Sequence, residues 1–339
     1  MGDTILMYQN NSIRKKIKRA VLLLSACFFL VACELPGSQQ QGQFDSEAAA
    51  DKPVWLNMAK TFPETKDLPD GNGQKAKVII FIGQSNATGC SLNSYLEKNL
   101  GAEAYKKYEQ GFSNIRINFC LDDQKYTSNG EFVTTDLTCA AGGCFGPEVG
   151  IAETLAEAYP EETVFILKYT MSGYSLHHHW LSEGKRGSIY EAFMIFAKQY
   201  MDTLVAHNYD AKIGAICWMQ GESDTTYYKA SKYYNNQKSF VEYLREDFAT
   251  YAEDGGIYFI DAGISNSPYC EPAYKEINEA KEQFGKDSNM NIYFPTISEG
   301  LTIHLEPEGD PDWGHYDSLS ELKLGQLFGK HIIESYEKR

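Results

Sequence analysis

Positive charge is scarce in this sequence. Its 339 residues contain 31 Lys and Arg against 46 Asp and Glu, which gives a formal net charge of −15 at pH 7. An acidic surface repels the phosphates of nucleic acids, so the composition argues against a nucleic acid partner. The sequence also lacks a CxxC pair and any Cys/His spacing typical of zinc sites. We therefore expect no metal and no other cofactor.

A second linker and an internal repeat are missing as well. No Pro/Gly/Ser-rich stretch interrupts the chain after its first fifty residues. The remaining length is within the range of a single α/β domain. We therefore expect one domain over residues 53–339, preceded by two short segments, 1–32 and 33–52. No pattern in the sequence indicates the oligomeric state.

The first segment has the pattern of a secretion signal. A basic cluster precedes an apolar run over residues 20–32, and the cluster consists of Arg14, Lys15, Lys16, Lys18 and Arg19. The apolar run is too short to span a bilayer comfortably, which favours a cleaved signal over a transmembrane helix. The residues Leu-Val-Ala-Cys that end at Cys33 resemble the lipobox of bacterial lipoproteins. That resemblance implies acylation of Cys33, and a plain secretion signal or a single membrane anchor remains the alternative.

Residues 33–52 are polar and small, with three consecutive glutamines and a run of alanines. Such a stretch cannot bury a core, so we expect a flexible tether. Glu34 follows Cys33, which mildly favours the outer membrane. The expected location is the bacterial cell envelope, at the periplasm-facing outer membrane or the cell surface. The membrane would then be a partner only through the lipid at Cys33.

Eight cysteines are present. Cys27 lies in the signal segment and Cys33 is the lipidation candidate, which leaves Cys90, Cys120, Cys139, Cys144, Cys217 and Cys270. In an oxidising compartment some of these six are expected to pair. The segment between Cys120 and Cys144 is a candidate for a stapled insertion. The sequence does not determine the connectivity.

Short apolar strands alternate with helical patterns along the domain. The predicted strands are 77–82, 163–169, 213–219, 257–261 and 292–297, and the predicted helices are 148–158, 189–207, 227–251, 273–284 and 318–336. Nearly continuous apolar strands between helices indicate a parallel sheet covered on both faces. We expect an α/β fold, a three-layer α/β/α sandwich with about five strands. Ligands in such folds bind at the carboxyl ends of the strands.

Candidate reactive residues follow the first of these strands. Gly83, Gln84, Ser85 and Asn86 come directly after it. A serine at a tight strand-to-helix turn is exposed at the rim of the sheet, with its backbone N–H directed at a bound ester. A helix cap is the other reading of this segment.

Two further loops follow the second and third strands. The loop Ser172-Gly173-Tyr174-Ser175 offers the Gly173 N–H as a donor to an oxyanion. After the third strand, Gln220 can aim its side-chain amide at the same point. Glu222 and Asp224 follow it, and they either fix neighbouring loops or cap a helix.

A late segment supplies a candidate base. His315 follows Asp312 by three residues, so this carboxylate can lie beside the His315 Nδ1. Such a hydrogen bond holds the ring in one tautomer and stabilises the imidazolium during a reaction. Glu222 is the alternative acidic partner.

These segments together resemble the SGNH hydrolases, and in particular the carbohydrate esterase branch with sialate O-acetylesterases and acetylxylan esterases. The matching pieces are GQSN at 83–86, KYTMSGYSL with Trp180, WMQGESD at 218–224 and DWGH at 312–315. The similarity covers about residues 77–330. The usual Gly-Gly-Thr-Ser is Ser-Gly-Tyr-Ser here, and the usual Asp-Gly-x-His is Asp-Trp-Gly-His.

The resemblance implies a serine carbohydrate esterase with a flavodoxin-like sheet that removes O-acetyl groups from glycans of the sialic acid or xylan type. It implies Ser85 as nucleophile, His315 as base and Asp312 as orienting acid. The oxyanion hole would comprise the N–H groups of Ser85 and Gly173 and the Gln220 side chain. Candidates for support or substrate contact are Gln84, Asn86, Glu222, Asp224 and Trp180.

Three consecutive histidines, His177 to His179, precede Trp180. In an extended chain neighbouring side chains point to opposite faces, so a shared metal ion is disfavoured. One His or Trp180 against a sugar, or a plain surface, remain the two readings. For the whole chain, the alternatives are a non-catalytic glycan-binding lipoprotein on the same fold, or an SGNH lipase or thioesterase.

Overall fold

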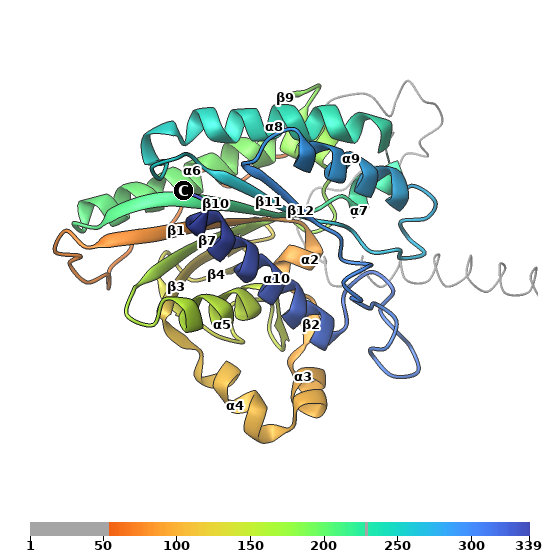
Figure 1. Ribbon diagram of the computed structural model, residues 1–339, viewed down its shortest axis with the longest axis horizontal. Helices are drawn as coiled ribbons and strands as arrows, with labels where there is room; N and C mark the ends of the chain where they lie inside the picture. Colours follow the sequence, from red (N-terminus) through yellow and green to blue (C-terminus); the bar gives the residue numbers. More distant parts are fainter. Residues whose placement is uncertain (1–53, 228–229) are drawn as a thin grey trace, which may run out of the picture. The chain divides into compact units, whose positions relative to one another are not determined.

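The computed structural model describes residues 54–227 and 230–339. The expected signal segment, the lipidation site Cys33 and the whole of the expected tether lie outside these residues. The described residues fold around one large sheet with helices on both faces (Figure 1). None of their helices is both long enough and apolar enough to cross a bilayer.

The sheet has eight strands, of which six are parallel. The parallel strands, in their order across the sheet, are β12 (Asn291–Phe294), β11 (Tyr258–Ala262), β10 (Asp210–Met219), β1 (Lys75–Gly83), β7 (Val164–Thr170) and β3 (Phe112–Leu121). Two short strands, β4 (Tyr126–Thr127) and β5 (Val133–Thr135), pair antiparallel with β3. The three-layer α/β prediction is confirmed.

The five predicted strands correspond to β1, β7, β10, β11 and β12, while β3 was not predicted. The sequence of β3 mixes apolar with polar and charged residues (FSNIRINFCL), so it lacks the continuous apolar run of its neighbours. In space β3 lies outside β7, so β1 sits between β7 and β10. Among the five predicted strands, the order β7-β1-β10-β11-β12 is therefore the flavodoxin order, in which the first strand lies between the second and the third, and β3 adds a strand outside β7.

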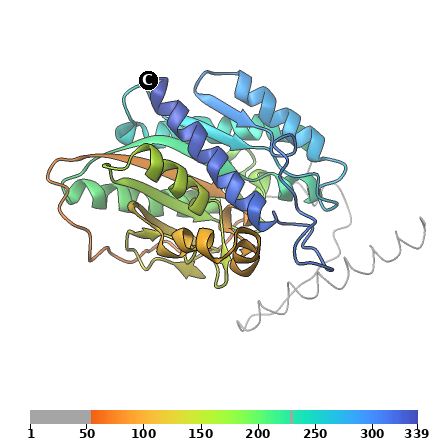
Figure 2. The same cartoon turned by 60° about the horizontal axis from the view of Figure 1, so that its bottom comes forward.

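Helices cover both faces of the sheet. On one face lie α6 (Ser188–Ala206), α8 (Tyr233–Asp247) and α9 (Tyr274–Lys286). On the other face α10 (Ser318–Glu337) runs beside α5 (Glu148–Ala158), as Figure 2 shows. All five were predicted, with ends that differ by a few residues. Strands buried on both faces need this double cover, because either face would otherwise expose apolar side chains.

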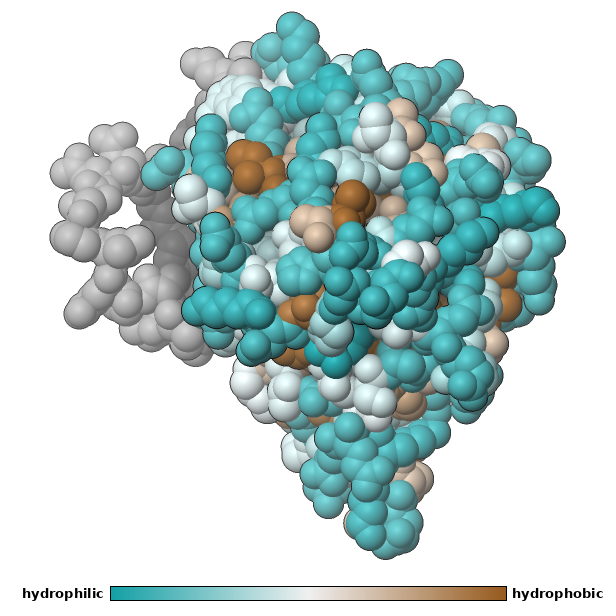
Figure 3. All heavy atoms as spheres, turned by 90° about the vertical axis from the view of Figure 1, so that its left-hand side faces the viewer, coloured by the Kyte–Doolittle hydropathy of each residue, from teal (hydrophilic) through white to brown (hydrophobic). Residues whose placement is uncertain are grey.

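Smaller elements connect the large helices and the strands. They are α2 (Ser85–Thr88), α3 (Asn93–Leu100), α4 (Ala102–Gln110), α7 (Glu222–Tyr227), the antiparallel pair β2 (Ser91–Leu92) and β6 (Cys144–Phe145), and the pair β8 (Leu181–Ser182) and β9 (Lys185–Arg186). A one-turn π-helix covers Leu176–Trp180, and 3₁₀ turns cover Ala230–Lys232 and Ala249–Tyr251. The face drawn in Figure 3 is mostly hydrophilic, with only small scattered apolar areas.

A buried lysine joins the layers near the first strand end. Lys168 on β7 is fully buried, and its Nζ lies 2.6 Å from Glu148 Oε2 at the start of α5. The same ammonium donates to the backbone oxygen of Thr88 in α2 at 2.9 Å. A buried charge is tolerated only when it is paired and fully hydrogen-bonded. Lys168 therefore fixes α2 relative to β7 and α5.

Candidate active site

The turn after β1 places Ser85 at the rim of the sheet. Gly83 has a φ of +156°, and a Cβ at this position would lie 2.0 Å from the backbone oxygen of Met219, so only glycine fits. Gln84 then links the neighbouring strand: its N–H donates to the Met219 oxygen at 3.0 Å, and its side-chain oxygen accepts from the Ser223 N–H at 3.2 Å. These contacts set the direction of the turn that carries Ser85.

Ser85 itself keeps its polar groups available. It is partly exposed, whereas Gln84 and Asn86 on either side of it are buried. Among the described residues, neither its hydroxyl nor its backbone N–H has a hydrogen-bond partner. A hydroxyl nucleophile and an oxyanion donor need this freedom.

The loop after β7 brings a second free N–H. Gly173 is exposed, with a φ of +79° that favours glycine, and its N–H has no acceptor within the described part of the chain. Ser172 anchors this loop, since its N–H donates to Asp122 Oδ1 at 2.7 Å. The Ser172 hydroxyl also lies 3.1 Å from Thr88 Oγ1 in α2. The Gly173 loop is therefore tied to the helix that begins with Ser85.

Gln220 lies behind these loops and is fully buried. Its amide nitrogen donates to Asp224 Oδ2 at 2.6 Å and, over a longer distance of 3.3 Å, to the backbone oxygen of Tyr174. Its amide oxygen accepts from the Tyr233 hydroxyl at 3.0 Å. Only the amide hydrogen on the long contact is weakly held, so only that hydrogen could turn toward an oxyanion.

Asp224 organises the loop that carries Gly173. Besides Gln220, its carboxylate accepts from the backbone N–H groups of Leu176 at 2.9 Å and His177 at 3.1 Å. Burial raises the pKa of Asp224 to about 6, although these hydrogen bonds oppose the shift. The supporting role predicted for Asp224 corresponds to its hydrogen bonds with Gln220, Leu176 and His177.

Asn86 connects the serine turn to the segment around His315. Its side-chain oxygen accepts from the Tyr316 N–H at 3.2 Å, and its amide nitrogen lies 3.4 Å from the Gly314 oxygen. The two residues on either side of His315 are thus held by the residue that follows Ser85. A direct hydrogen bond between Ser85 and His315 is absent from the contacts of the described residues.

His315 and Asp312 form a hydrogen-bonded pair on an otherwise irregular loop between β12 and α10. The His315 Nδ1 lies 2.7 Å from Asp312 Oδ2, and the other carboxylate oxygen accepts from the Gly314 N–H at 3.0 Å. Burial opposes ionisation of Asp312, but the bond to His315 lowers the pKa of this carboxyl. The sequence predicted this pairing from the three-residue spacing.

Glu222, the alternative partner, is directed elsewhere. Its Oε1 accepts from the Asn86 amide at 2.7 Å, and its Oε2 has no hydrogen-bond partner in the described residues. Glu222 therefore supports Asn86, while the geometry favours Asp312 as the partner of His315.

A cysteine that the sequence did not single out also lies in this site. Cys90 Sγ is 3.5 Å from the backbone oxygen of Ser85. Burial favours the neutral imidazole of His315, but the neighbouring Cys90 and Asp312 outweigh it and raise the pKa of His315 well above its usual value. Cys90 was considered only as a disulfide candidate, and no sequence signal linked it to His315.

The expected disulfides are not found. The six cysteines of the described domain, Cys90, Cys120, Cys139, Cys144, Cys217 and Cys270, all carry free thiols. Burial raises the pKa of Cys120, Cys139 and Cys270 to about 12, which keeps them as small apolar side chains.

The expected sugar contact by Trp180 is wrong. Trp180 has no exposed surface and packs edge-on against Trp218 and Phe240 in the core. Sequence position suggested a rim residue, but the π-helical turn directs this side chain inward. Trp180 instead supports the loop from below.

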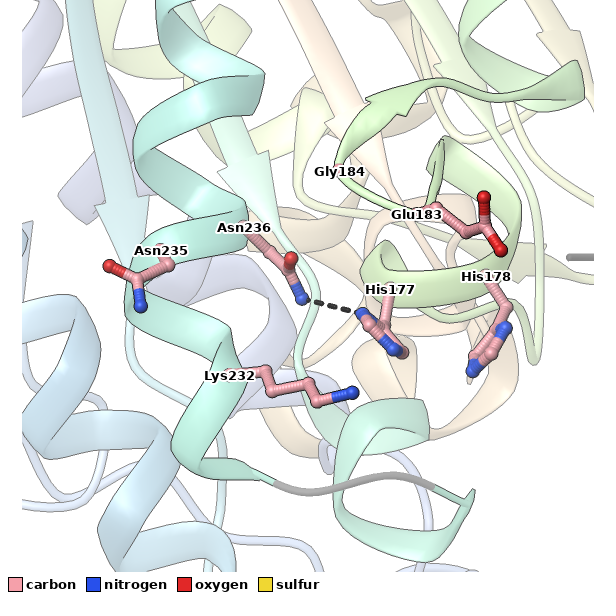
Figure 4. Close-up of a pocket in the computed structure, with 7 residues that line it drawn as sticks. All are labelled: His177, His178, Glu183, Gly184, Lys232, Asn235 and Asn236. Atoms are coloured by element: carbon pink, nitrogen blue, oxygen red, sulfur yellow. Dashed lines mark hydrogen bonds between the residues drawn. The ribbon is translucent and has the colours of Figure 1, made fainter. Parts of the chain in front are cut away.

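The three histidines lie on that same turn rather than on an extended segment. His177 and His178 line a cavity of about 440 Å³ together with Lys232 and Asn236, and Figure 4 shows how these side chains lie. The His177 Nδ1 lies 2.9 Å from the Asn236 amide. The His179 Nδ1 accepts from the Ser175 N–H at 3.1 Å, and burial lowers the pKa of His179 to about 4. No cluster of His, Cys, Asp and Glu in the described residues is arranged to hold a metal ion.

The comparisons with known proteins agree with this architecture. Residues 75–334 match the family described as carbohydrate esterase, sialic acid-specific acetylesterase. No significant match was found among curated proteins. Two solved structures are similar to this chain over nearly their whole length. A protein from Arabidopsis thaliana has a TM-score of 0.54 and 15% identity over 76% of this chain and 98% of that one. NanS has a TM-score of 0.51 and 14% identity over 80% of this chain and 99% of that one.

A third solved structure is a carbohydrate acetylesterase from Xanthomonas citri, XAC1771, with a TM-score of 0.50 and 14% identity over 75% of this chain and 56% of that one. At such identities the structures support the fold alone. The family match covers most of the chain and carries the assignment. This protein belongs to the carbohydrate esterases of the sialic acid-specific acetylesterase family and has the fold of the SGNH hydrolases.

Proposed function

We propose that this carbohydrate esterase removes O-acetyl groups from glycans with Ser85 as nucleophile. The observation that carries the proposal is the bridge made by Asn86, whose side chain holds both neighbours of His315 beside the serine turn. The pair of Asp312 and His315 supplies a base in a fixed orientation. Apo enzymes often show loose catalytic contacts that close when substrate binds.

In the proposed mechanism His315 accepts the Ser85 proton while Oγ attacks the acetyl carbonyl carbon. The N–H groups of Ser85 and Gly173 stabilise the tetrahedral oxyanion, and the Gln220 amide joins them when it releases Tyr174. The C–O bond to the sugar breaks, and His315 returns the proton to the sugar oxygen. A water molecule, deprotonated by His315, then attacks the acetyl-enzyme, and acetate leaves while Ser85 recovers its proton.

The substrate of this proposal is an acetylated glycan of the sialic acid or xylan type. The family description and the carbohydrate acetylesterase among the similar structures support this class. Asp122 lies beside the Gly173 loop, and Asp312 lies beside His315. Carboxylate oxygens that accept hydrogen bonds from sugar hydroxyls therefore border both sides of the site.

The test is acetate release from a panel of O-acetylated glycans by the wild-type protein and by Ser85→Ala. We expect the variant to lose the activity while keeping its thermal unfolding transition. Labelling by a fluorophosphonate should occur at Ser85 in the wild type and disappear in the variant. An intact Ser85→Ala protein that hydrolyses p-nitrophenyl acetate as fast as the wild type would reject the assignment.

We also propose that the esterase is held in the cell envelope by a lipid at Cys33. The support is the basic and apolar signal pattern that ends at this cysteine. Incorporation of labelled palmitate into the full chain should require Cys33 and be lost in Cys33→Ala. Equal labelling of both proteins would exclude the lipoprotein assignment.

A further inference from the structure

Two exposed aromatic side chains flank the segment that carries the candidate base. Tyr269 is 41% exposed and Trp313 is 42% exposed, and Trp313 lies between Asp312 and Gly314. The Tyr269 ring lies over Gly314, because a Cβ at that glycine would be 3.8 Å from two of its ring carbons. The two rings come from segments more than forty residues apart and reach the same short loop.

A single buried hydroxyl sets the relative position of the two residues. Ser267, which is almost fully buried, donates to the backbone oxygen of Trp313 at 2.5 Å. The same hydroxyl accepts from the Tyr269 N–H at 3.1 Å. His304 lies nearly parallel to the Trp313 ring, with centroids 6.3 Å apart. The loop therefore presents the aromatic side chains in a preformed arrangement.

Carboxylates border the rings. Asp312 and Asp310 lie close enough to the Tyr269 hydroxyl to raise its pKa, together with burial, which is the larger cause. Asp310 is exposed. Exposed apolar rings beside polar acceptors are typical of a binding surface, since solvent-facing aromatic area is otherwise unfavourable.

A sugar ring can contact both the aromatic rings and the carboxylates. The axial C–H groups of a pyranose form an apolar face with a slight positive charge, which complements the negative face of an aromatic ring. Its hydroxyl groups are donors that fit the oxygen atoms of carboxylates. A long acyl chain would also contact aromatic rings, but it has no donor for the exposed carboxylate of Asp310.

We propose that Tyr269 and Trp313 form a subsite that stacks against a pyranose ring of the acetylated glycan. This proposal rests on the proposed function, because it assigns the glycan part of the ester to the His315 side of the site. Binding of the ring there places the leaving sugar oxygen near the imidazole that returns its proton. Small acetate esters without a ring do not use the subsite.

The test compares two substrates in four proteins: wild type, Trp313→Ala, Tyr269→Ala and Trp55→Ala. The substrates are an acetylated xylo-oligosaccharide and ethyl acetate, both followed by acetate release. We expect each subsite variant to raise KM for the oligosaccharide by about tenfold, a factor equivalent to one stacking contact, and to change kcat/KM for ethyl acetate by a much smaller factor. Trp55, 58% exposed, lies on the segment that contacts the start of α6 and is the matched control.

Two additional measurements separate the possible failures. Tyr269→Phe and Trp313→Phe retain a ring and should keep most of the oligosaccharide affinity, whereas an unchanged KM in both Ala variants would overturn the subsite. A fall in activity on longer acyl esters, with KM for the oligosaccharide unchanged, would assign the rings to an acyl chain instead. Retained deacetylation by Ser85→Ala would overturn the proposed function itself, independently of the KM values.

Discussion

The two sides of the candidate site differ in how they are held. On the strand side, Gln220 and Asp224 are buried, and each of them makes several short hydrogen bonds. On the loop side, Asp312 is about half exposed and its pair with His315 is joined to the strand side through Asn86. The sheet therefore fixes where the candidate oxyanion donors lie, whereas the buried Asn86 amide positions the candidate base.

The carboxylates on the two sides also differ in the direction of their pKa shifts. Burial raises the pKa of Asp224 to about 6, whereas the contact with His315 lowers the pKa of Asp312 against the effect of burial. A carboxylate that holds backbone N–H groups in the core therefore has a different role from one that faces an imidazole. The predictions below test this distinction, beginning with the largest expected effect on activity.

The first prediction contrasts Asp312→Asn with Glu222→Gln. Asp312→Asn should lower kcat by roughly 10²–10⁴-fold, because the amide cannot stabilise the imidazolium or its tautomer. Glu222→Gln keeps an acceptor for Asn86 and should change kcat by less than about tenfold. Steady-state hydrolysis of p-nitrophenyl acetate measures both. The opposite ranking would make Glu222 the acidic partner.

The second prediction concerns Gln220→Ala. Loss of an oxyanion donor typically lowers kcat by roughly 10²–10³-fold. The substitution also removes one hydrogen-bond partner from Asp224 and one from the Tyr233 hydroxyl, so thermal unfolding must be measured in parallel. Tyr233→Phe, which removes the hydroxyl that contacts the Gln220 amide oxygen, the Gln220 backbone oxygen and Trp218 Nε1, is the control for that structural effect. Similar kinetic losses in the two variants would show that Gln220 is purely structural.

The third prediction concerns Asn86→Ala, which removes the bridge between the two sides. We expect kcat/KM to fall by roughly tenfold to a hundredfold, because the loop with His315 loses its hydrogen bonds to the serine turn. The buried Tyr316 N–H and Glu222 carboxylate lose a partner, so the free energy of unfolding should fall by about 1–3 kcal/mol. Chemical denaturation measures this change. Full activity would show that the loop is positioned independently of Asn86.

The fourth prediction, with the smallest effect, concerns pH. The base must be neutral, so kcat/KM should rise with pH around a pKa above the usual value of about 6.5 for histidine. Cys90→Ala removes one of the groups that raise the pKa of His315, so this rise should move to lower pH. An unchanged profile in the variant would show that Cys90 does not act on the base.

The same shifts predict the pH dependence of stability. A raised histidine pKa stabilises the fold fully below the unfolded pKa, and this contribution is lost as the pH rises past the folded pKa. Because folding raises the pKa of Asp224, this residue lowers the free energy of unfolding increasingly as the pH rises from 3.8 to about 6. In Asp224→Asn the free energy of unfolding should lack this decrease between pH 3.8 and about 6.

Much of this architecture could be predicted from local patterns. The strands β1, β7 and β10 are apolar runs, and the polar loops that follow them were expected at one edge of the sheet. The spacing of Asp312 and His315 was enough to predict their pair, because three residues bring such side chains together in a tight turn. Strand β3 was missed because its polar residues hide the periodicity.

The sequence by itself determined which residues reach the carboxyl edge of the sheet, since hydrophobic periodicity and turn glycines act locally. Only the tertiary structure decided that Trp180 is buried in the core, that Cys90 lies beside His315 and that Tyr269 lies against the loop that carries Trp313. These contacts join segments far apart in the chain. They depend on packing between layers, which no local pattern encodes.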